Sequence, residues 1–362
     1  MSDGEQLTVE RINDLGSIRS EWSALAEASG NVFATWEFSD IWWRAFGADR
    51  PLLVTACRRD DGSLATIVPL YEASRRPVRV LRFLGHGSAA LTGPISAAGD
   101  PNIAAAGLRA TLRARLWPWD VLFADGLPAR EVWRARVGGR RWGHPEADPV
   151  LRIDGAGWEQ YLATLSSNLR QQVRRRERKL LAAHDVQIRL VHDPARLAED
   201  FETFLRLHDA RWEGSSTSFA GERGDFHREF AAVAFERGWL RLWIMEVDDA
   251  PVAAWYGFRF GGADWFRQAG RDPAWDRHNV GFVLLVRTIR EAFEDEMREY
   301  RFLRGDDAYK FRFANDDPGA ETIVLGRGLS GRGAILGVAS ARALPIGPLR
   351  RALRRVTGIE RY

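Results

Sequence analysis

Apolar residues recur at helical spacing along residues 158–183, where Leu162, Leu165, Leu169, Val173 and Leu180 share one face. This pattern predicts a long amphipathic helix. Three apolar runs follow at 240–247, 252–260 and 263–270. The pairs Asp248-Asp249 and Gly261-Gly262 between them are typical of tight turns, so these runs predict three antiparallel strands.

The whole pattern predicts two halves with a similar order of elements. In the first half we expect strands at 7–11, 52–58, 64–72, 78–84 and 120–124, and helices at 15–28, 37–46 and 101–116. In the second half we expect further helices at 194–212, 226–236 and 281–297, strands at 186–191, 300–303 and 321–325, and a helical turn at 308–313. We therefore expect an α/β protein with mixed sheets in two lobes, 1–149 and 150–327, and a basic tail, 328–362.

Composition narrows the class of protein. The 362 residues are 45% hydrophobic and 28% charged, with a net charge of +3, which is ordinary for a globular protein. No run of about 18 apolar residues is present, and the first residues lack a basic and an apolar region. The single cysteine, Cys57, excludes an intramolecular disulfide. We expect a cytoplasmic protein without a secretory signal.

The tail ends in a short segment, 349–356, that is typical of a basic amphipathic helix. Two interpretations remain open for it. It packs on the body as a solvated helix, or it docks weakly on an anionic membrane, as a peripheral contact, or on an anionic partner.

A first candidate site is the turn at 272–280 that leaves a predicted strand and enters the helix at Gly281. The backbone N–H groups of a helix N-terminus attract phosphate, and Arg271, Arg277 and His278 lie beside this turn. The turn is a pyrophosphate cradle, or an ordinary connection in which Gly281 allows close packing.

A second candidate is the segment 301–313, where titratable side chains follow a short strand. Asp306, Asp307, Tyr309 and Lys310 supply a base, an acid and a cation, and catalytic groups favour such loops. The alternative is a surface turn in which Asp306 caps the next helix.

A third candidate is the basic run at 168–179, where Arg170, Arg174 and Arg178 share one helical face. It is a solvated face, or a clamp for a phosphorylated or acidic substrate.

Most of the fifteen tryptophans are expected in the core, and a few could line a substrate groove. No histidine pair has metal-ligand spacing, and no nucleophile elbow, P-loop or Rossmann fingerprint is present.

Together, the order of elements after residue 150 and the motifs at 168–179, 272–285 and 302–313 resemble the GNAT superfamily. Within it, the chain looks like the CelD/BcsL-type acetyltransferases, which are related to the two-lobed FemABX peptidyltransferases. The resemblance is best over about 150–327, and the first half looks like a degenerate copy. The superfamily's phosphate loop, Q/R-x-x-G-x-G/A, matches here at Gly281, whereas His278 and Val283 depart from it.

The resemblance implies a sheet splayed between two strands, with acetyl-CoA or another acyl-CoA in the cleft and no metal. It implies direct transfer to a small-molecule or saccharide acceptor, with backbone N–H groups of 263–270 polarising the thioester carbonyl. The implied catalytic residues are Asp306 as base, Tyr309 as acid, and Lys310. Donor contacts are expected from Gln268, Arg277, His278, Asn279, Val280, Gly281 and Phe282. Acceptor contacts are expected from Arg170, Arg174, Trp212, Tyr256 and Arg304.

Two alternatives remain. Fem-like enzymes use aminoacyl-tRNA, and the basic run and tail would suit RNA; otherwise we expect no nucleic-acid partner. The departures at His278 and Val283 also leave room for a non-catalytic binding protein that keeps the fold.

Overall fold

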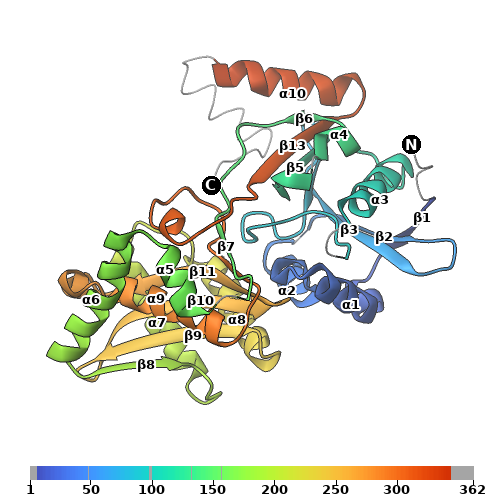
Figure 1. Ribbon diagram of the computed structural model, residues 1–362. Helices are drawn as coiled ribbons and strands as arrows, with labels where there is room; N and C mark the ends of the chain where they lie inside the picture. The colour runs from blue at the N-terminus through green and yellow to red at the C-terminus, as the bar shows by residue number, and fades with distance from the viewer. Residues whose placement is uncertain (1–5, 48, 98–99, 132, 156, 344–362) are drawn as a thin grey trace. The chain divides into compact units, whose positions relative to one another are not determined.

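The computed structural model describes residues 6–343 except 48, 98–99, 132 and 156 (Figure 1). The chain forms two compact units. The first combines residues 1–146 with 318–362, and the second is 147–317. Each unit is described by itself.

The first unit is built on a seven-stranded mixed sheet in the order β1-β2-β3-β4-β5-β13-β6. Its strands are β1 (Thr8–Ile12), β2 (Leu52–Arg58), β3 (Leu64–Ser74), β4 (Val80–Phe83), β5 (Val121–Pro128), β6 (Arg140–Arg141) and β13 (Ala320–Gly326). Strands β2 and β3 are almost wholly buried, as expected for strands covered on both faces.

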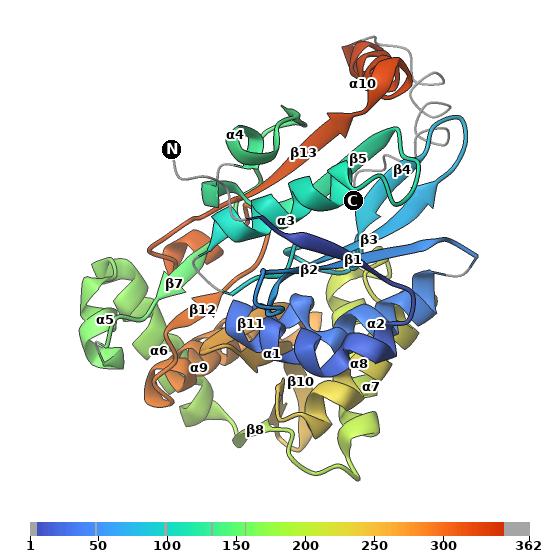
Figure 2. The same ribbon diagram turned by 90° about the vertical axis from the view of Figure 1, so that its right-hand side faces the viewer.

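Helices cover both faces of this sheet. They are α1 (Arg19–Ser29), α2 (Trp36–Phe46), α3 (Pro101–Arg113), α4 (Trp133–Val137) and α10 (Gly328–Ala343). Figure 2 shows α3 on one face and α1 with α2 on the other. Proline at the start of α3 and the Asp100 side chain, which accepts from Ile103 N, explain where that helix begins.

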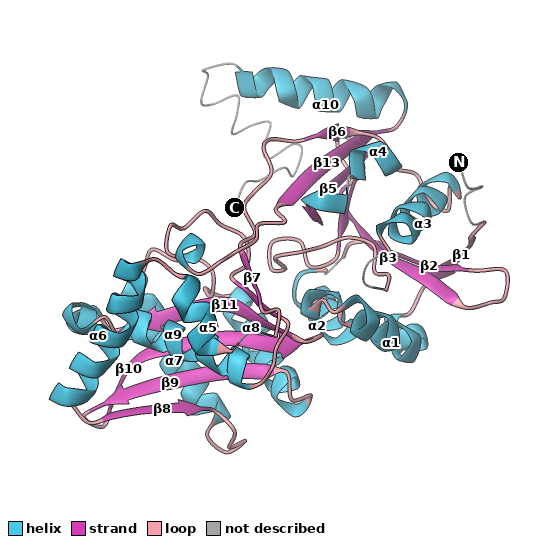
Figure 3. Cartoon of the chain, viewed as in Figure 1, coloured by secondary structure: helices cyan, strands magenta, loops and turns pink. Residues whose placement is uncertain are grey.

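The second unit has a six-stranded mixed sheet in the order β7-β12-β11-β10-β9-β8. Its strands are β7 (Val150–Arg152), β8 (Val186–Leu190), β9 (Leu240–Val247), β10 (Ala250–Phe260), β11 (Ala263–Arg271) and β12 (Glu299–Arg301). Strands β8 to β11 form the antiparallel part, coloured magenta in Figure 3. Positive φ angles at Asp248, Asp249, Gly261 and Gly262 form the two predicted turns.

Side chains of successive strand residues point to opposite faces, which divides this unit into two cores. Trp255 lies in a cluster with residues of α5 (Trp158–Thr164), α6 (Ser167–Ala183) and α9 (Val280–Glu294). Tyr256 instead packs on α7 (Leu197–Trp212), with its ring centroid 5.1 Å from that of Phe204. Phe258 contacts Phe230 of α8 (Glu222–Glu236).

Both units contain the same strand–helix–strand motif, in which two parallel strands pair briefly and then diverge. In the first unit β4 and β5, joined through α3, pair only at Val80–Val121 and Leu81–Leu122. In the second unit β11 and β12, joined through α9, pair at three positions from Ala263–Glu299 to Trp265–Arg301. The repeated motif agrees with the expected pair of GNAT-like lobes.

One strand lies in a different unit from the one expected. β13 was expected within the lobe 150–327, but it pairs with β5 and β6 of the first unit. In the second unit, β12 instead takes β7 as its antiparallel neighbour. The buried side chains of Ile323 and Val324 explain this placement, because they pack in clusters of the first unit.

The expected single helix at 158–183 is two helices, α5 and α6. The chain turns at Leu165 and Ser166, and the Ser166 side chain accepts from Leu169 N as the N-cap of α6. Helix α10 covers the start of the expected tail and packs on β13, whereas the predicted helix at 349–356 lies outside the described residues. Within residues 6–343, no helix is long and apolar enough to cross a bilayer.

Candidate active site

The site is organised by the divergence of β11 from β12. After Trp265, β11 continues to Arg271 while β12 ends at Arg301. Strand β10 pairs with β11 along its other edge up to Arg271. The second half of β11 therefore has one edge that no described strand covers, as the splayed sheet of the resemblance predicts.

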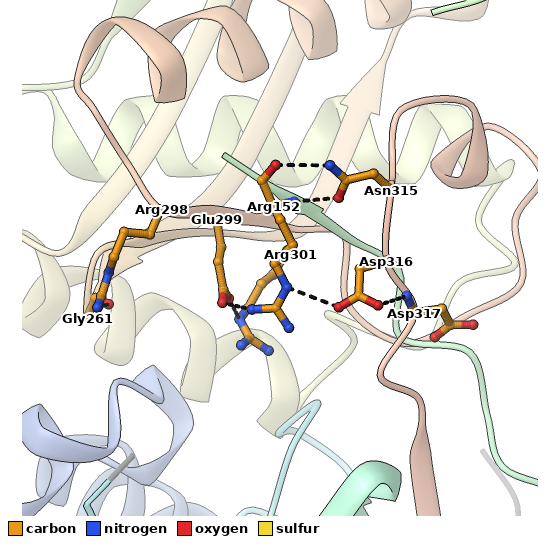
Figure 4. A network of polar contacts seen from close by, with 8 residues as sticks. All are labelled: Arg152, Gly261, Arg298, Glu299, Arg301, Asn315, Asp316 and Asp317. Atoms are coloured by element: carbon orange, nitrogen blue, oxygen red, sulfur yellow. Dashed lines mark hydrogen bonds and ion pairs between the residues drawn. The ribbon is translucent and has the colours of Figure 1, made fainter. Parts of the chain in front are cut away.

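A polar network fixes β12 beside β7 (Figure 4). The Arg152 guanidinium binds the carboxylates of Glu299 and Asp316, and the Asn315 side-chain amide bonds both Arg152 N and Arg152 O. Arg301 forms an ion pair with Glu299 at 2.7 Å. These contacts hold the end of β12 and so the position where the two strands part.

Ala269 presents both of its backbone polar groups at the uncovered edge of β11. Its N–H donates to Oε1 of Gln268 at 3.3 Å, and its carbonyl oxygen accepts from Nη1 of Arg211 at 3.1 Å. Both contacts are with side chains, which can rotate away. The Ala269 N–H is therefore the donor best placed to reach a ligand carbonyl.

The predicted phosphate turn leads directly from this edge into α9. Residues Pro273–His278 form a 3-10 helix, and Asn279 adopts φ 58° before α9 begins. No side chain caps the first turn of α9, so its first amides remain available to an anion. The rings of Trp275, His184 and His278 contact one another, with centroids 5.0 Å apart for Trp275 and His184, 5.1 Å for Trp275 and His278, and 4.9 Å for the two histidines. This cluster fixes the turn against the end of α6.

The residues expected to contact the acyl donor differ in exposure and in their present partners. Val280 is fully buried, so its side chain does not contact a ligand. A Cβ on Gly281 would lie 3.3 Å from Arg271 Cδ, so larger side chains would crowd the first turn. Arg277 is exposed and bonds His278 Nε2. The guanidinium carbons of Arg176 and Arg312 lie 4.5 and 5.7 Å from the ring centroid of Phe282.

Lys310 is buried, and its ammonium group bonds to other groups of the chain. Its Nζ donates to the carbonyl oxygens of Leu303 at 3.3 Å and Arg304 at 2.9 Å, and pairs with Asp307 at 3.0 Å. Leu303 has φ 60° and Gly305 has φ 125°. Lys310 thus holds an unusual backbone turn, and the structure gives it a positioning role instead of direct contact with the acceptor.

Tyr309 and Asp306 lie on the segment after this turn. Burial raises the pKa of Tyr309 to about 12, Asp307 acts in the same direction, and Arg211 opposes it. A phenol with this pKa stays protonated at neutral pH and can act as an acid. Asp306 is exposed, and Tyr309, not Asp306, precedes the short helix Lys310–Arg312. Asp306 therefore does not serve as that helix's cap.

Two arginines of the basic face on α6 already have partners within the chain. Arg170 donates to the carbonyl oxygens of Ala163 and Leu165, at 2.7 and 2.6 Å, and so caps the end of α5. Arg174 pairs with Glu159 at 3.0 Å. Both guanidinium groups bind neighbouring parts of the chain, because the turn between α5 and α6 brings those carbonyls and Glu159 within reach.

The other expected acceptor residues are distributed between core and surface. Tyr256 is fully buried, and its hydroxyl lies 3.3 Å from Nδ1 of His227; a direct contact with substrate is therefore not supported. Trp212 is 40% exposed at the end of α7. Arg304 follows β12 on the turn that Lys310 holds.

Arg211 is a residue with functional potential that the sequence did not predict. Arg211 binds the β11 edge and interacts electrostatically with Tyr309, Asp307 and Asp276. It therefore connects the two predicted motifs. Its neighbour Trp212 was the only signal pointing to it.

Two further groups are buried without complete hydrogen bonding. Asp148 is 1% exposed, its Oδ1 has no hydrogen-bond partner, and burial raises its pKa. Arg267 in β11 has a buried Nε without a hydrogen-bond partner. Spacing and composition gave no signal for either residue. Within the described part of the chain, no three His, Cys, Asp or Glu side chains come together to hold a metal ion.

Comparisons with known proteins bear on the family and on the fold. Residues 167–311 match the sequence model of the family described as "Acetyltransferase (GNAT) domain". No curated protein matches the sequence.

The fold is similar to three solved structures. FemX is 10% identical, with 87% of this chain and 97% of FemX covered and a TM-score of 0.60. A conserved protein of unknown function from Bacteroides thetaiotaomicron is 14% identical, with 89% and 100% covered and a TM-score of 0.53. L-PGS from Bacillus licheniformis is 12% identical, with 88% and 95% covered and a TM-score of 0.51. At these identities the likeness concerns the fold. The family match adds the chemistry: residues 167–311 are similar to a GNAT acetyltransferase domain, and the protein is an acyltransferase.

Proposed function

We propose that the protein transfers an acyl group from acetyl-CoA, or another acyl-CoA, to the amine or hydroxyl of a small-molecule or saccharide acceptor. The uncovered edge of β11 beside the uncapped first turn of α9 is the observation that carries this proposal. The edge of β11 offers an N–H that can bind the acyl carbonyl, and the first turn of α9 offers amides that can bind phosphate. We retain the CelD/BcsL-type resemblance as the narrower expectation.

In the proposed reaction, the acceptor nitrogen or oxygen forms a bond to the acyl carbon as the carbon–sulfur bond breaks. The nucleophile's proton passes to Asp306, and the departing thiolate receives a proton from Tyr309. The N–H of Ala269 binds the developing oxyanion after the Gln268 side chain moves aside. Lys310 holds the turn between β12 and these groups. Most of the acceleration comes from holding donor and acceptor together.

Calorimetric titration of acetyl-CoA tests the donor. Binding should be lost in Gly281→Trp, because the indole would occupy the first turn of α9 beside Arg271. Gly157→Trp is the matched control, since no atom of the described residues lies within 4 Å of its Cβ position. Failure of the wild type to bind acetyl-CoA or longer acyl-CoAs would contradict the proposal.

A second candidate is transfer from an aminoacyl-tRNA. Arg175, Arg178 and Lys179 remain exposed on α6, which favours contact with a phosphate backbone. RNA binding would weaken steeply as salt rises, because each phosphate contact releases counterions. A charged-tRNA titration at two salt concentrations separates this candidate from CoA binding, for which we expect a shallower dependence.

A further inference from the structure

Arg211 lies near the end of α7, where this helix packs directly on β11. A Cβ at Gly270 would lie 2.4 Å from the backbone nitrogen of His208, so helix and strand are in close contact there. Arg211 follows His208 by three residues and so lies on the same side of the helix. This placement explains how its guanidinium reaches the carbonyl oxygen of Ala269, the residue before Gly270.

Two contacts define the position of the Arg211 guanidinium. Its Nη1 donates to the Ala269 carbonyl oxygen at 3.1 Å, and its Cζ lies 5.1 Å from the centroid of the Trp212 ring. A guanidinium has five N–H donors in a fixed fork. The bond to Ala269 therefore leaves Arg211 with further donors directed along the edge of β11.

Arg211 also brings a positive charge to this edge that no carboxylate of the described residues neutralises by an ion pair. The two carboxylates with which it interacts electrostatically, Asp276 and Asp307, pair with Arg271 and Lys310. The guanidinium is only half-exposed, so a charge beside it is screened less than in water. A negative charge that develops at this edge would therefore be strongly stabilised.

The geometry of a strand edge places Arg211 beside the oxygen that Ala269 N–H would bind. The N–H and C=O of one strand residue point to the same edge, because directly opposed residues of a hydrogen-bonded pair exchange both bonds. Nη1 of Arg211 lies where the N–H of such an opposed residue would lie. An acyl oxygen on Ala269 N–H, about 2.9 Å from the nitrogen, would lie where the C=O of that residue would lie. These two positions are adjacent.

We propose that Arg211 is a catalytic residue that donates, together with the N–H of Ala269, to the developing oxyanion. This inference rests on the proposed acyl transfer and adds a residue to it. As the acceptor bonds to the acyl carbon, the C=O electron pair moves onto the oxygen, and it returns as the C–S bond breaks. The cation binds this oxygen most strongly while it is charged, which lowers the barrier.

The test compares two CoA thioethers by calorimetry at pH 7.5 and constant ionic strength. S-carboxymethyl-CoA carries a carboxylate next to the sulfur-bound carbon, and S-carbamoylmethyl-CoA carries a neutral amide of the same shape there. The wild type should bind the carboxylate about ten- to a hundredfold more tightly, because a charged hydrogen bond adds to its affinity. Arg211→Met should lose this preference. Its Kd for acetyl-CoA should change by no more than about threefold, because a hydrogen bond to a neutral carbonyl is weaker.

Three further variants make the result specific. Arg206→Met removes an exposed arginine of the same helix and should keep the full preference for the carboxylate. Arg211→Lys retains the charge and should keep part of the preference. If Arg211→Met does not fold, Arg211→Gln takes its place, because the amide removes the charge but can still donate to Ala269.

The outcomes separate this inference from the proposed function. If the thioethers bind but the wild type does not prefer the carboxylate, or if Arg211→Met keeps the preference, Arg211 is not an oxyanion donor. Equal weakening of both thioethers in Arg211→Met also overturns the inference, because Arg211 would then only brace α7 against β11. In these cases the acyl-CoA donor stands. If neither thioether nor acetyl-CoA binds the wild type, the proposed donor is wrong and the role of Arg211 is overturned with it.

Discussion

The ammonium group of Lys310 lies 2.9 Å from the carbonyl oxygen of Arg304 and holds the turn that follows β12. The same group also bonds the carbonyl of Leu303 and pairs with Asp307. A lysine suits this position because its ammonium is a compact donor of three hydrogen bonds, whereas guanidinium is a planar fork. This relationship gives a physical reason for a lysine at this position in a chain with only two lysines.

Replacing Lys310 by Met should lower the free energy of unfolding by about 1–3 kcal/mol, because two carbonyl groups lose their buried donor. Lys310→Arg should not restore it. Urea unfolding measures the change. The matched control is Lys179→Met, which removes the other, exposed lysine and should leave stability unchanged. Equal stability of Lys310→Met and the wild type would contradict the positioning role.

Tyr309→Phe should lower kcat by about 10²–10⁴-fold, the usual contribution of a general acid. The phenol pKa of about 12 keeps Tyr309 protonated to well above pH 9. Deprotonation of Tyr309 should therefore cause no decrease in kcat as the pH rises to 9. Rates are followed by release of free CoA thiol from acetyl-CoA.

Asp306→Asn should reduce kcat by a similar factor, because an amide cannot accept the nucleophile's proton. Asp249→Asn changes another exposed aspartate, in a turn distant in sequence, and should keep full turnover. Full turnover in both Tyr309→Phe and Asp306→Asn would remove these residues from the mechanism.

Stability should depend on pH through His208. An unfolded histidine titrates near pH 6.5, whereas buried His208 has a pKa of about 4. The unfolded chain therefore binds more protons between these values. The stability that neutral His208 provides is fully present above pH 6.5. As the pH falls toward 4, the free energy of unfolding decreases by up to about 1.4 kcal/mol per pH unit.

The measurement is urea unfolding at pH 7.5, 6 and 5. His208→Phe should show a shallower loss of stability than the wild type, because Phe takes up no proton. His192→Phe alters an exposed histidine and should keep the wild-type slope. Parallel slopes for His208→Phe and the wild type would show that His208 is not buried in its neutral form.

Gly270 allows α7 to approach β11. A Cβ at this position would lie 2.4 Å from the backbone nitrogen of His208. Gly270→Ala should therefore destabilise the protein by about 1–3 kcal/mol through overpacking. Gly333→Ala in α10, where nothing lies within 4 Å, should instead stabilise by about 0.5–1 kcal/mol. Thermal unfolding of both variants checks the contrast.

The placement of β13 can be tested by hydrogen exchange. Ile323 is 1% exposed and packs with Leu122 of β5. Ile323→Ala should cost about 2–5 kcal/mol and increase amide exchange in β5 but not in β11. Ile289→Ala, in the core of the second unit, should show the opposite distribution. Faster amide exchange in β11 of the Ile323→Ala variant would contradict the placement of β13 in the first unit.

Local signals in the sequence were enough to predict many elements. The three strands β9 to β11 were predicted within two residues of their observed bounds, because apolar runs and positive-φ turns are encoded by adjacent residues. Helix α9 and the turn before it were also predicted. The break between α5 and α6 was missed, although Ser166 carried the N-cap signal.

The sequence by itself determined the class of fold, the two-lobed order of elements and the two motifs around Gly281 and Lys310. Only the tertiary structure decided that β13 belongs to the first unit, because its partner β5 lies about 190 residues away and strand pairing has no local signature. Hydrogen bonds that exist only in the folded chain likewise decided that Lys310 holds a turn and that Arg170 caps a helix.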